Sequence, residues 1–270
     1  MKIIIIILLS LFSFNSVVLA ATVYDYAEYK VLIESKLDNK ITKINKYFPT
    51  AGIISHHLPT AAPLISEFYL KLKARRPEIK KFIVIGPDHF ERCRSNFSYS
   101  SEKIKTSFGE MMPDEKIISG LKDSGASEDK KCFNGEHAIG VQANFIKKLY
   151  PDASLTPIIL SYSARNRNFS KLIKYLSENE DIFVVASLDF SHYLKKDKAE
   201  AIDAITKDKI ENRDGLGLAL KNVDSPATLK LMLDLARKKK EKVEIINHKN
   251  SADFTGDKNN TTSYFDVFFY

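Results

Sequence analysis

Residues 82–89 have the sequence Phe-Ile-Val-Ile-Gly-Pro-Asp-His, a continuous apolar run that ends in Asp88 and His89. An apolar run of this length without alternation is typical of a strand that is buried on both faces of a sheet. The same pattern recurs in residues 52–57 and 182–192, and both segments also end in histidine. Because the carboxyl ends of parallel strands meet at one edge of a sheet, we expect these histidines to lie around a single crevice.

The rest of the chain continues this alternation of strands and helices. Apolar runs predict strands at residues 52–55, 82–86, 155–160, 182–187, 243–247 and 264–269. Helical periodicity and capping signals predict helices at residues 61–75, 114–121, 137–149, 169–177, 196–211 and 226–239. The pattern indicates an α/β fold, a single-domain sandwich with a central mixed or mostly parallel sheet flanked by helices. The polar segments 91–112 and 250–262 are predicted to be loops, and the strand order stays open.

The first residues are typical of a signal peptide. A lysine precedes an apolar run over residues 3–12, and Val18 and Ala20 suit the −3 and −1 positions of a signal-peptidase site. The run is shorter than the ~20 residues of a transmembrane helix. We expect residues 1–20 to be removed on export, which leaves a secreted or periplasmic domain over residues 21–270 with no stable membrane span. Retention of the segment as an uncleaved anchor is the alternative.

The net charge of +7 does not indicate a nucleic-acid partner. Many of the basic residues are lysines of the kind seen at 238–240, where a solvated helix end is the ordinary explanation. Nucleic-acid binding would require basic residues interleaved with exposed aromatic residues on one element, and the sequence contains no such stripe. We expect a small molecule or a peptide as the partner, and the oligomeric state stays open.

Cys93 and Cys132 are the two cysteines of the chain. In a protein that matures in an oxidising compartment, an even number of cysteines predicts a disulfide. It would connect the segment after His89 to the segment before His137, and closing a loop of this size contributes about 3–4 kcal/mol in the chain-entropy model. The alternative is a pair of reduced thiols that bind a metal or act in redox chemistry.

His57 and His89 are the predicted metal ligands. Imidazole is the commonest protein ligand for iron, copper and zinc, and a set of two histidines and one carboxylate leaves open positions on the ion. Each histidine follows a different strand, so the rigid sheet would fix their separation. His56 is expected to point away, because neighbouring side chains alternate in an extended segment. For each histidine alone, a hydrogen-bonded structural role is the alternative.

Asp189 and His192 are a predicted acid–base pair. A carboxylate near an imidazole holds its tautomer and raises its basicity, which suits a general base or the support of a metal ligand. The alternative is that Asp189 caps a turn and His192 lies on the surface. His137 follows Glu136 at the start of a predicted helix, where the helix dipole would keep it neutral and able to hydrogen-bond a ligand. Glu136 could serve only to complement that dipole.

Several sequence elements together resemble a known family. They are Gly-Ile-Ile-Ser-His-His at residues 52–57, Ile-Gly-Pro-Asp-His at 85–89, Glu-His-Ala-Ile-Gly-Val-Gln at 136–142, Ser-Leu-Asp-Phe-Ser-His at 187–192, and the late Asn247, Ser251 and Ser263-Tyr264. In order and spacing they are similar to the Memo-like family, also called AmmeMemoRadiSam system protein B. The resemblance covers nearly all of residues 21–270.

This resemblance implies a fold and a set of roles. The family is similar in fold to class III extradiol dioxygenases, whose iron is held by two His and a Glu. By the resemblance, His57 and His89 match the first two metal positions. His137 and His192 match histidines on the substrate side, and Asp189 matches the acidic residue near the latter.

The resemblance also suggests a third metal ligand. Memo-like proteins can carry a Cys just before the helix predicted here at residues 226–239, and an ungapped alignment places Asp224 at that position. A carboxylate there restores a His-His-carboxylate set. The chain departs from the family at residues 56–59, which are His-His-Leu-Pro where members tend to have Pro-His-Ala-Gly.

The resulting hypothesis is an exported protein with a mononuclear Fe(II) or copper site at the carboxyl ends of its strands, acting as an oxidoreductase or in a dioxygenase-like reaction. The first alternative is a non-catalytic module that binds a peptide or a small ligand in the same crevice. The second is a structural surface protein with a degenerate site. The choice of metal and the substrate stay open.

Overall fold

The computed structural model describes residues 21–24, 26–38 and 47–270, so the predicted signal peptide lies outside the described residues. The main sheet has nine strands in the order β10-β12-β2-β9-β3-β8-β4-β7, and β11 also pairs with β12. The four central strands are parallel: β2 (Ala51–Ile54), β9 (Ile182–Ser187), β3 (Lys81–Pro87) and β8 (Ser154–Leu160). The flanking strands make the sheet mixed: β12 (Thr261–Phe269), β10 (Phe190–Leu194), β11 (Val243–Asn250), β4 (Phe97–Tyr99) and β7 (Ser127–Glu128).

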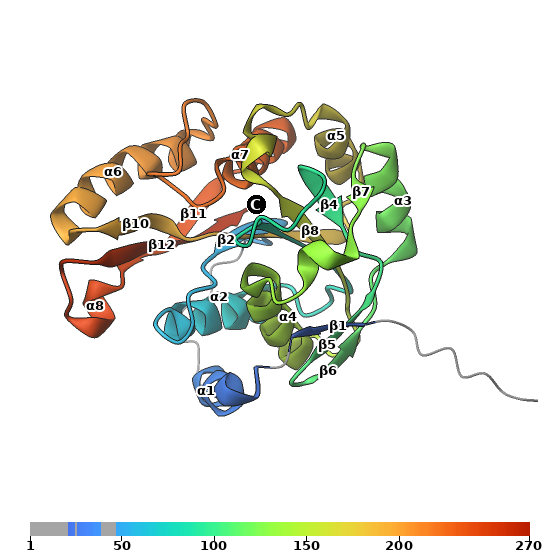
Figure 1. Ribbon diagram of the computed structural model, residues 1–270, viewed down its shortest axis with the longest axis horizontal. Helices are drawn as coiled ribbons and strands as arrows, with labels where there is room; N and C mark the ends of the chain where they lie inside the picture. The colour runs from blue at the N-terminus through green and yellow to red at the C-terminus, as the bar shows by residue number, and fades with distance from the viewer. Residues whose placement is uncertain (1–20, 25, 39–46) are drawn as a thin grey trace, which may run out of the picture.

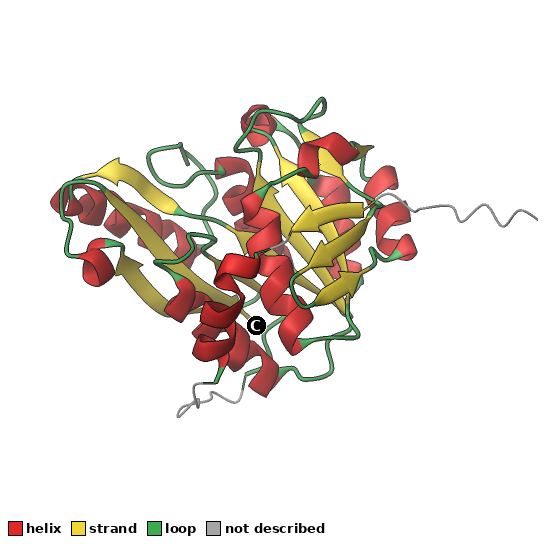
Figure 2. Cartoon of the chain, turned by 60° about the horizontal axis from the view of Figure 1, so that its bottom comes forward, coloured by secondary structure: helices red, strands yellow, loops and turns green. Residues whose placement is uncertain are grey.

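Helices cover both faces of this sheet (Figures 1 and 2). One face packs on α2 (Ala62–Arg75) and α4 (His137–Leu149), with α1 (Ala27–Leu37) packed against α2. The other face packs on α3 (Glu115–Asp123), α5 (Ser170–Glu178), α6 (Lys196–Asn212) and α7 (Pro226–Lys239). The central strands therefore divide their apolar side chains between two cores. In β3, Ile83 and Ile85 join the core with α7, whereas Phe82 and Val84 join the core with α2 and α4. Burial on both faces explains why these strands are continuous apolar runs, and it confirms the predicted α/β fold.

The predicted loop over residues 91–112 is wrong in part. It contains β4, β5 (Lys103–Thr106) and β6 (Gly109–Met111), and β5 and β6 form a second sheet with β1 (Ala21–Tyr24) beside α4. The predicted connection 250–262 holds a short helix, α8 (Ala252–Thr255). These elements are short and rich in polar residues, so hydrophobic periodicity gives little signal for them.

Two helices begin and end where the sequence predicted, and capping groups fix the start of each. The Glu136 carboxylate accepts a hydrogen bond from the amide of Ala138 at the start of α4. At α7, the Ser225 hydroxyl accepts from the amide of Thr228, and Pro226 occupies the first turn. Both helix starts carry residues discussed below, so the caps also fix the site. Within the described part of the chain, no helix is long and apolar enough to cross a membrane.

Candidate metal centre

Three neighbouring strands bring polar residues to one edge of the sheet. In the sheet, β9 lies between β2 and β3, and all three run parallel. Their carboxyl ends lead directly into His56, Asp189 and His89, which therefore lie at one edge of the sheet. This is the convergence that the sequence pattern predicted.

The first residue of α4 reaches the same edge because Gly86 lets the helix approach β3 closely. A Cβ atom at position 86 would lie 2.8 Å from the Cβ of Ala138, which is closer than two carbon atoms can pack. The glycine thus allows the start of α4 to sit against the end of β3. This contact carries Glu136 and His137 to the side of His89.

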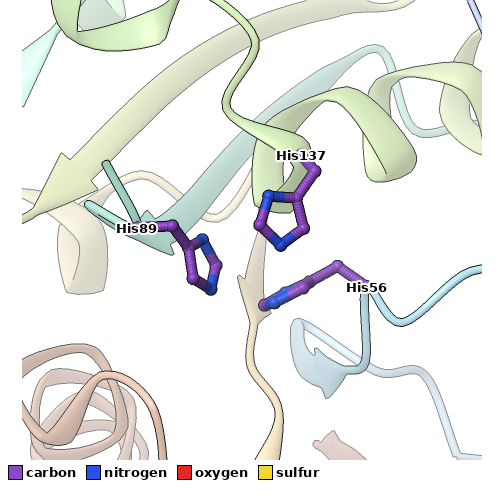
Figure 3. A group of neighbouring side chains, drawn as sticks. All are labelled: His56, His89 and His137. Atoms are coloured by element: carbon purple, nitrogen blue, oxygen red, sulfur yellow. The ribbon is translucent and has the colours of Figure 1, made fainter.

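The rings of His56, His89 and His137 face one another (Figure 3). The ring centroids are 5.0 Å apart for His56 and His89, 5.0 Å for His56 and His137, and 4.1 Å for His89 and His137. One ring nitrogen from each lies within 4.8 Å of the others. This group of three imidazoles could hold a metal ion.

Asp224 adds a carboxylate to this group. Its Oδ2 lies 3.4 Å from Nε2 of His56 and 3.7 Å from Nε2 of His89. The backbone of Asp189 holds this residue through two hydrogen bonds: the amide of Asp189 donates to Asp224 Oδ2 at 3.1 Å, and the amide of Asp224 donates to the Asp189 carbonyl at 3.0 Å. In the described structure, Oδ1 of Asp224 is buried and has no hydrogen-bond partner.

In His56 and His89, Nδ1 contacts another side chain, and Nε2, on the other side of the ring, faces Asp224. Nδ1 of His89 lies 2.7 Å from Oε1 of Glu136, and Nδ1 of His56 lies 3.1 Å from the hydroxyl of Ser187. Gln142 donates to the same hydroxyl at 3.0 Å and so holds Ser187 in place. A proton on each Nδ1 leaves Nε2 with a free lone pair, which is the form that binds a metal.

The surroundings give His89 and His137 different protonation states. Burial lowers the pKa of His89, but hydrogen bonds to Asp224 and Glu136 outweigh this effect and raise the pKa to about 10. Burial and the neighbouring His56 and His89 lower the pKa of His137 to about 4. Without a metal, His89 is therefore a cation between two carboxylates, and His137 is neutral.

His57 occupies a different place from the one predicted. Its Nδ1 hydrogen-bonds the hydroxyl of Tyr264 at 2.8 Å, and the histidine that faces His89 and His137 is His56. The chain leaves β2 after Ile54, so the strand alternation used to orient the two rings does not extend to them. The family motif offered a usable signal: a shift of one position matches residues 55–58 with Pro-His-Ala-Gly and puts His56 at its histidine. The structure thus groups His89 and Asp224 with His56 in place of His57.

Asp189 is buried beside the three imidazoles. Its carboxylate accepts hydrogen bonds from the hydroxyl of Ser55 and, at 3.3 Å, from the amide of His56, and its Oδ2 lies 3.5 Å from Nε2 of His56. Burial alone would raise the pKa of Asp189, but His56, Ser55 and the nearby His192 hold it below its ordinary value. His192, in β10, is half-buried and interacts with Asp189 electrostatically. The role of this pair as acid and base stays a prediction.

The disulfide lies beside the site, whereas the sixth histidine lies apart from it. The disulfide between Cys93 and Cys132 is formed, as expected, and joins the segment after His89 to the short helix η1 (Lys130–Phe133) before Glu136. His248 lies elsewhere: it hydrogen-bonds Asp203 at 3.1 Å and stacks on Phe265.

Comparisons with known proteins agree on one family. A family model described as "Memo-like protein" matches residues 19–268. A relative from Sulfurisphaera tokodaii is 31% identical over 69% of this chain and 71% of its own length. One from Caldivirga maquilingensis is 25% identical over 90% of this chain and 92% of its own length, and one from Aquifex aeolicus is 25% identical over 63% of this chain and 47% of its own length. All three carry the name "MEMO1 family protein".

Proposed function

Because this chain belongs to the Memo-like family, we propose that it is an exported oxidoreductase with a mononuclear Fe(II) or copper centre held by His56, His89 and Asp224. The observation that carries the proposal is the position of one carboxylate oxygen, Oδ2 of Asp224, at 3.4 Å and 3.7 Å from two imidazole nitrogens. The chemistry is dioxygenase-like, and the substrate is a small molecule.

The donor set fits such an ion. Tetrahedral ligands at about 2.1 Å from a metal are about 3.4 Å apart, which is close to the distances from Oδ2 of Asp224 to the two Nε2 atoms. The second oxygen of Asp224 is buried and has no hydrogen-bond partner in the described structure, so it is available to an ion bound at this place. Two histidines and one carboxylate are also the ligands of non-haem iron enzymes that react with dioxygen.

The surrounding residues have separate tasks. Fe(II) or copper bound here would supply the redox chemistry and polarise an oxygen of the substrate. Glu136 and Ser187 fix the tautomers of His89 and His56. His137 is the most accessible of the three clustered imidazoles and is neutral, so it can donate or accept a hydrogen bond with a substrate oxygen. We assign His137, His192 and Asp189 to the substrate side.

Export is a separate part of the proposal. Its support is the signal-like composition of residues 1–20 and the disulfide between Cys93 and Cys132, a bond that persists in oxidising compartments. Cell fractionation followed by N-terminal sequencing of the isolated protein tests it. A mature chain that begins near residue 21 in the periplasm or the medium supports export, and an intact chain in the cytoplasm contradicts it.

The metal proposal is tested by loading the purified protein anaerobically with Fe(II) or Cu(I) and measuring the bound metal after desalting. The expected result is one tight equivalent that is lost in His89→Ala and in Asp224→Ala. His248→Ala is the matched control, since His248 also pairs with a buried aspartate but lies outside the cluster. A His137→Ala variant should keep the metal and lose dioxygen uptake with substrate.

The same experiment separates the alternatives. A wild-type protein without a tight equivalent contradicts the metalloenzyme and leaves a module that binds a peptide or a small ligand in the same crevice. Anaerobic loading matters because a histidine-rich site takes up copper or zinc adventitiously during purification.

A further inference from the structure

A second group of metal-type ligands lies next to the histidine cluster. It consists of Asp88, Cys93 and Cys132, and one donor atom from each lies within 4.8 Å of the others. The sulfurs form a disulfide, so they cannot bind a metal in this state. We propose that reduction of this disulfide creates a second metal site, in which the two thiolates and the Asp88 carboxylate bind a zinc-type divalent cation.

The backbone holds the carboxylate beside the sulfurs whether or not they are bonded. Asp88 accepts hydrogen bonds from the amide of Arg92 on Oδ1 and from the amide of Cys93 on Oδ2, both at 3.0 Å. These bonds close the turn that carries Cys93. Because they do not involve the disulfide, Asp88 and Cys93 should stay neighbours after reduction.

The segment that carries Cys132 is fixed independently as well. The amide of Cys132 donates to the carbonyl of Asp129, and Asp129 in turn accepts from the amide of Arg94 at 2.8 Å. A further bond joins the two segments, from the Arg92 guanidinium to the carbonyl of Asn134 at 2.7 Å. Both cysteines therefore remain on facing segments, with their Cα atoms 4.5 Å apart when bonded.

The chemistry of the group matches zinc. Zinc takes four ligands from thiolate, imidazole and carboxylate groups, and water completes a set of three protein ligands. Two thiolates at about 2.3 Å from one ion lie about 3.8 Å apart, which a small rotation of the side chains provides once the bond is broken. The exposed side chains of Arg92 and Lys131, next to the two cysteines in the chain, favour the thiolate form.

The disulfide is accessible to a reductant on the Cys93 side. Cys132 is buried, but Cys93 is half-exposed, so a reductant can attack the Cys93 sulfur. With a dithiol as reductant, the bond between the two sulfurs breaks, each sulfur gains one electron and one proton, and the dithiol becomes a disulfide. Binding of the cation then releases the two thiol protons. The site therefore forms only under conditions that reduce the disulfide.

Cobalt and zinc titrations test this proposal without reference to the histidine centre. The protein is titrated with Co(II), then with Zn(II), in its oxidised form and after reduction with a phosphine. The reduced wild type should show a thiolate-to-cobalt charge-transfer band in the near ultraviolet and should bind one more equivalent of zinc than the oxidised protein. The His56→Ala/Asp224→Ala variant, which lacks the proposed first centre, should show the same gain.

Variants and a chemical block identify the ligands. Cys93→Ser should lose the band, as should wild-type protein whose reduced thiols are alkylated. Asp88→Asn, whose single side-chain oxygen can still accept one of the two amides, should bind zinc about 10-fold more weakly or worse. Asp257→Asn in an exposed loop is the control and should bind as the wild type does.

Three outcomes overturn the proposal. The first is equal zinc binding by the oxidised and reduced proteins, and the second is unchanged affinity in Asp88→Asn. The third is loss of the near-ultraviolet circular dichroism of the wild type on reduction, since the site requires both segments to stay folded.

Discussion

Nδ1 of His89 lies 2.7 Å from Oε1 of Glu136, a carboxylate that is fully buried. The same carboxylate accepts the amide of His89 through Oε2 and the amide of Ala138 through Oε1, both at 3.0 Å. Glu136 thus caps α4 and orients His89 at the same time. The sequence alone had suggested a role in the helix dipole, and the structure adds the contact with His89.

The first prediction concerns this contact. Glu136→Gln keeps the shape of the side chain but removes the charge that holds the Nδ1 proton of His89. We expect metal affinity to fall about 10- to 100-fold, as is usual when a carboxylate behind a ligating histidine is changed. Competition with a chromophoric chelator measures it. Glu115→Gln, at the start of α3, is the matched control for a glutamate in a first helical turn. Unchanged affinity in Glu136→Gln would show that His89 does not depend on this carboxylate.

The close approach of β3 and α4 gives a second prediction. Gly86→Ala forces a methyl group against Ala138, and overpacking of this kind costs about 1–3 kcal/mol of unfolding free energy. Urea denaturation measures the loss. Adding Ala138→Gly removes the clash at a cost of about 1 kcal/mol in the helix, so the double variant should be more stable than the sum of the single effects. Strict additivity would contradict direct contact at this position.

Asp266 provides a prediction about pH and stability. This buried residue on β12 accepts a hydrogen bond from Asn247, but burial outweighs that bond and raises the pKa from 3.8 to about 7. Between pH 4 and pH 7 the folded chain keeps a proton that the unfolded chain has lost. The contribution of the Asp266 carboxyl group to folding stability is therefore fully present below pH 4 and is lost as the pH rises through 7.

Asp266→Asn should remove this dependence. We expect the variant to match the wild type at pH 4 and to be more stable by about 2–4 kcal/mol at pH 8. Chemical denaturation at both values measures the difference, with the exposed Asp152→Asn as control. If the variant gains no stability at pH 8, the carboxyl group is not held protonated in the folded chain.

Much of the fold was predictable because local signals agreed with the tertiary structure. Continuous apolar runs marked β3 and β9, helical periodicity marked α4, and the Ser225-Pro226 start signal marked α7. The strand β10 was missed. Ser191 and Tyr193 adopt positive φ angles there, and its pairing with β12 shifts register twice, so it lacks the alternation by which a strand is predicted.

The sequence predicted where the site lies in the chain, but it did not predict which of two adjacent histidines faces the other ligands. The positions after three strands followed from sequence, and the resemblance placed Asp224 beside them. The choice between His56 and His57 did not follow, because it depends on a turn that leaves the strand at Ile54. The hydroxyl of Ser187 and the phenol of Tyr264 hold the two rings apart, and both contacts join residues distant in sequence.

The most direct test of the account compares the adjacent variants His56→Ala and His57→Ala. After anaerobic loading with Fe(II) or Cu(I), His56→Ala should lose the tight equivalent, because its Nε2 faces Asp224. His57→Ala should keep it with an affinity close to that of the wild type, because its ring hydrogen-bonds Tyr264. Loss of the metal in His57→Ala together with its retention in His56→Ala would contradict the proposed centre.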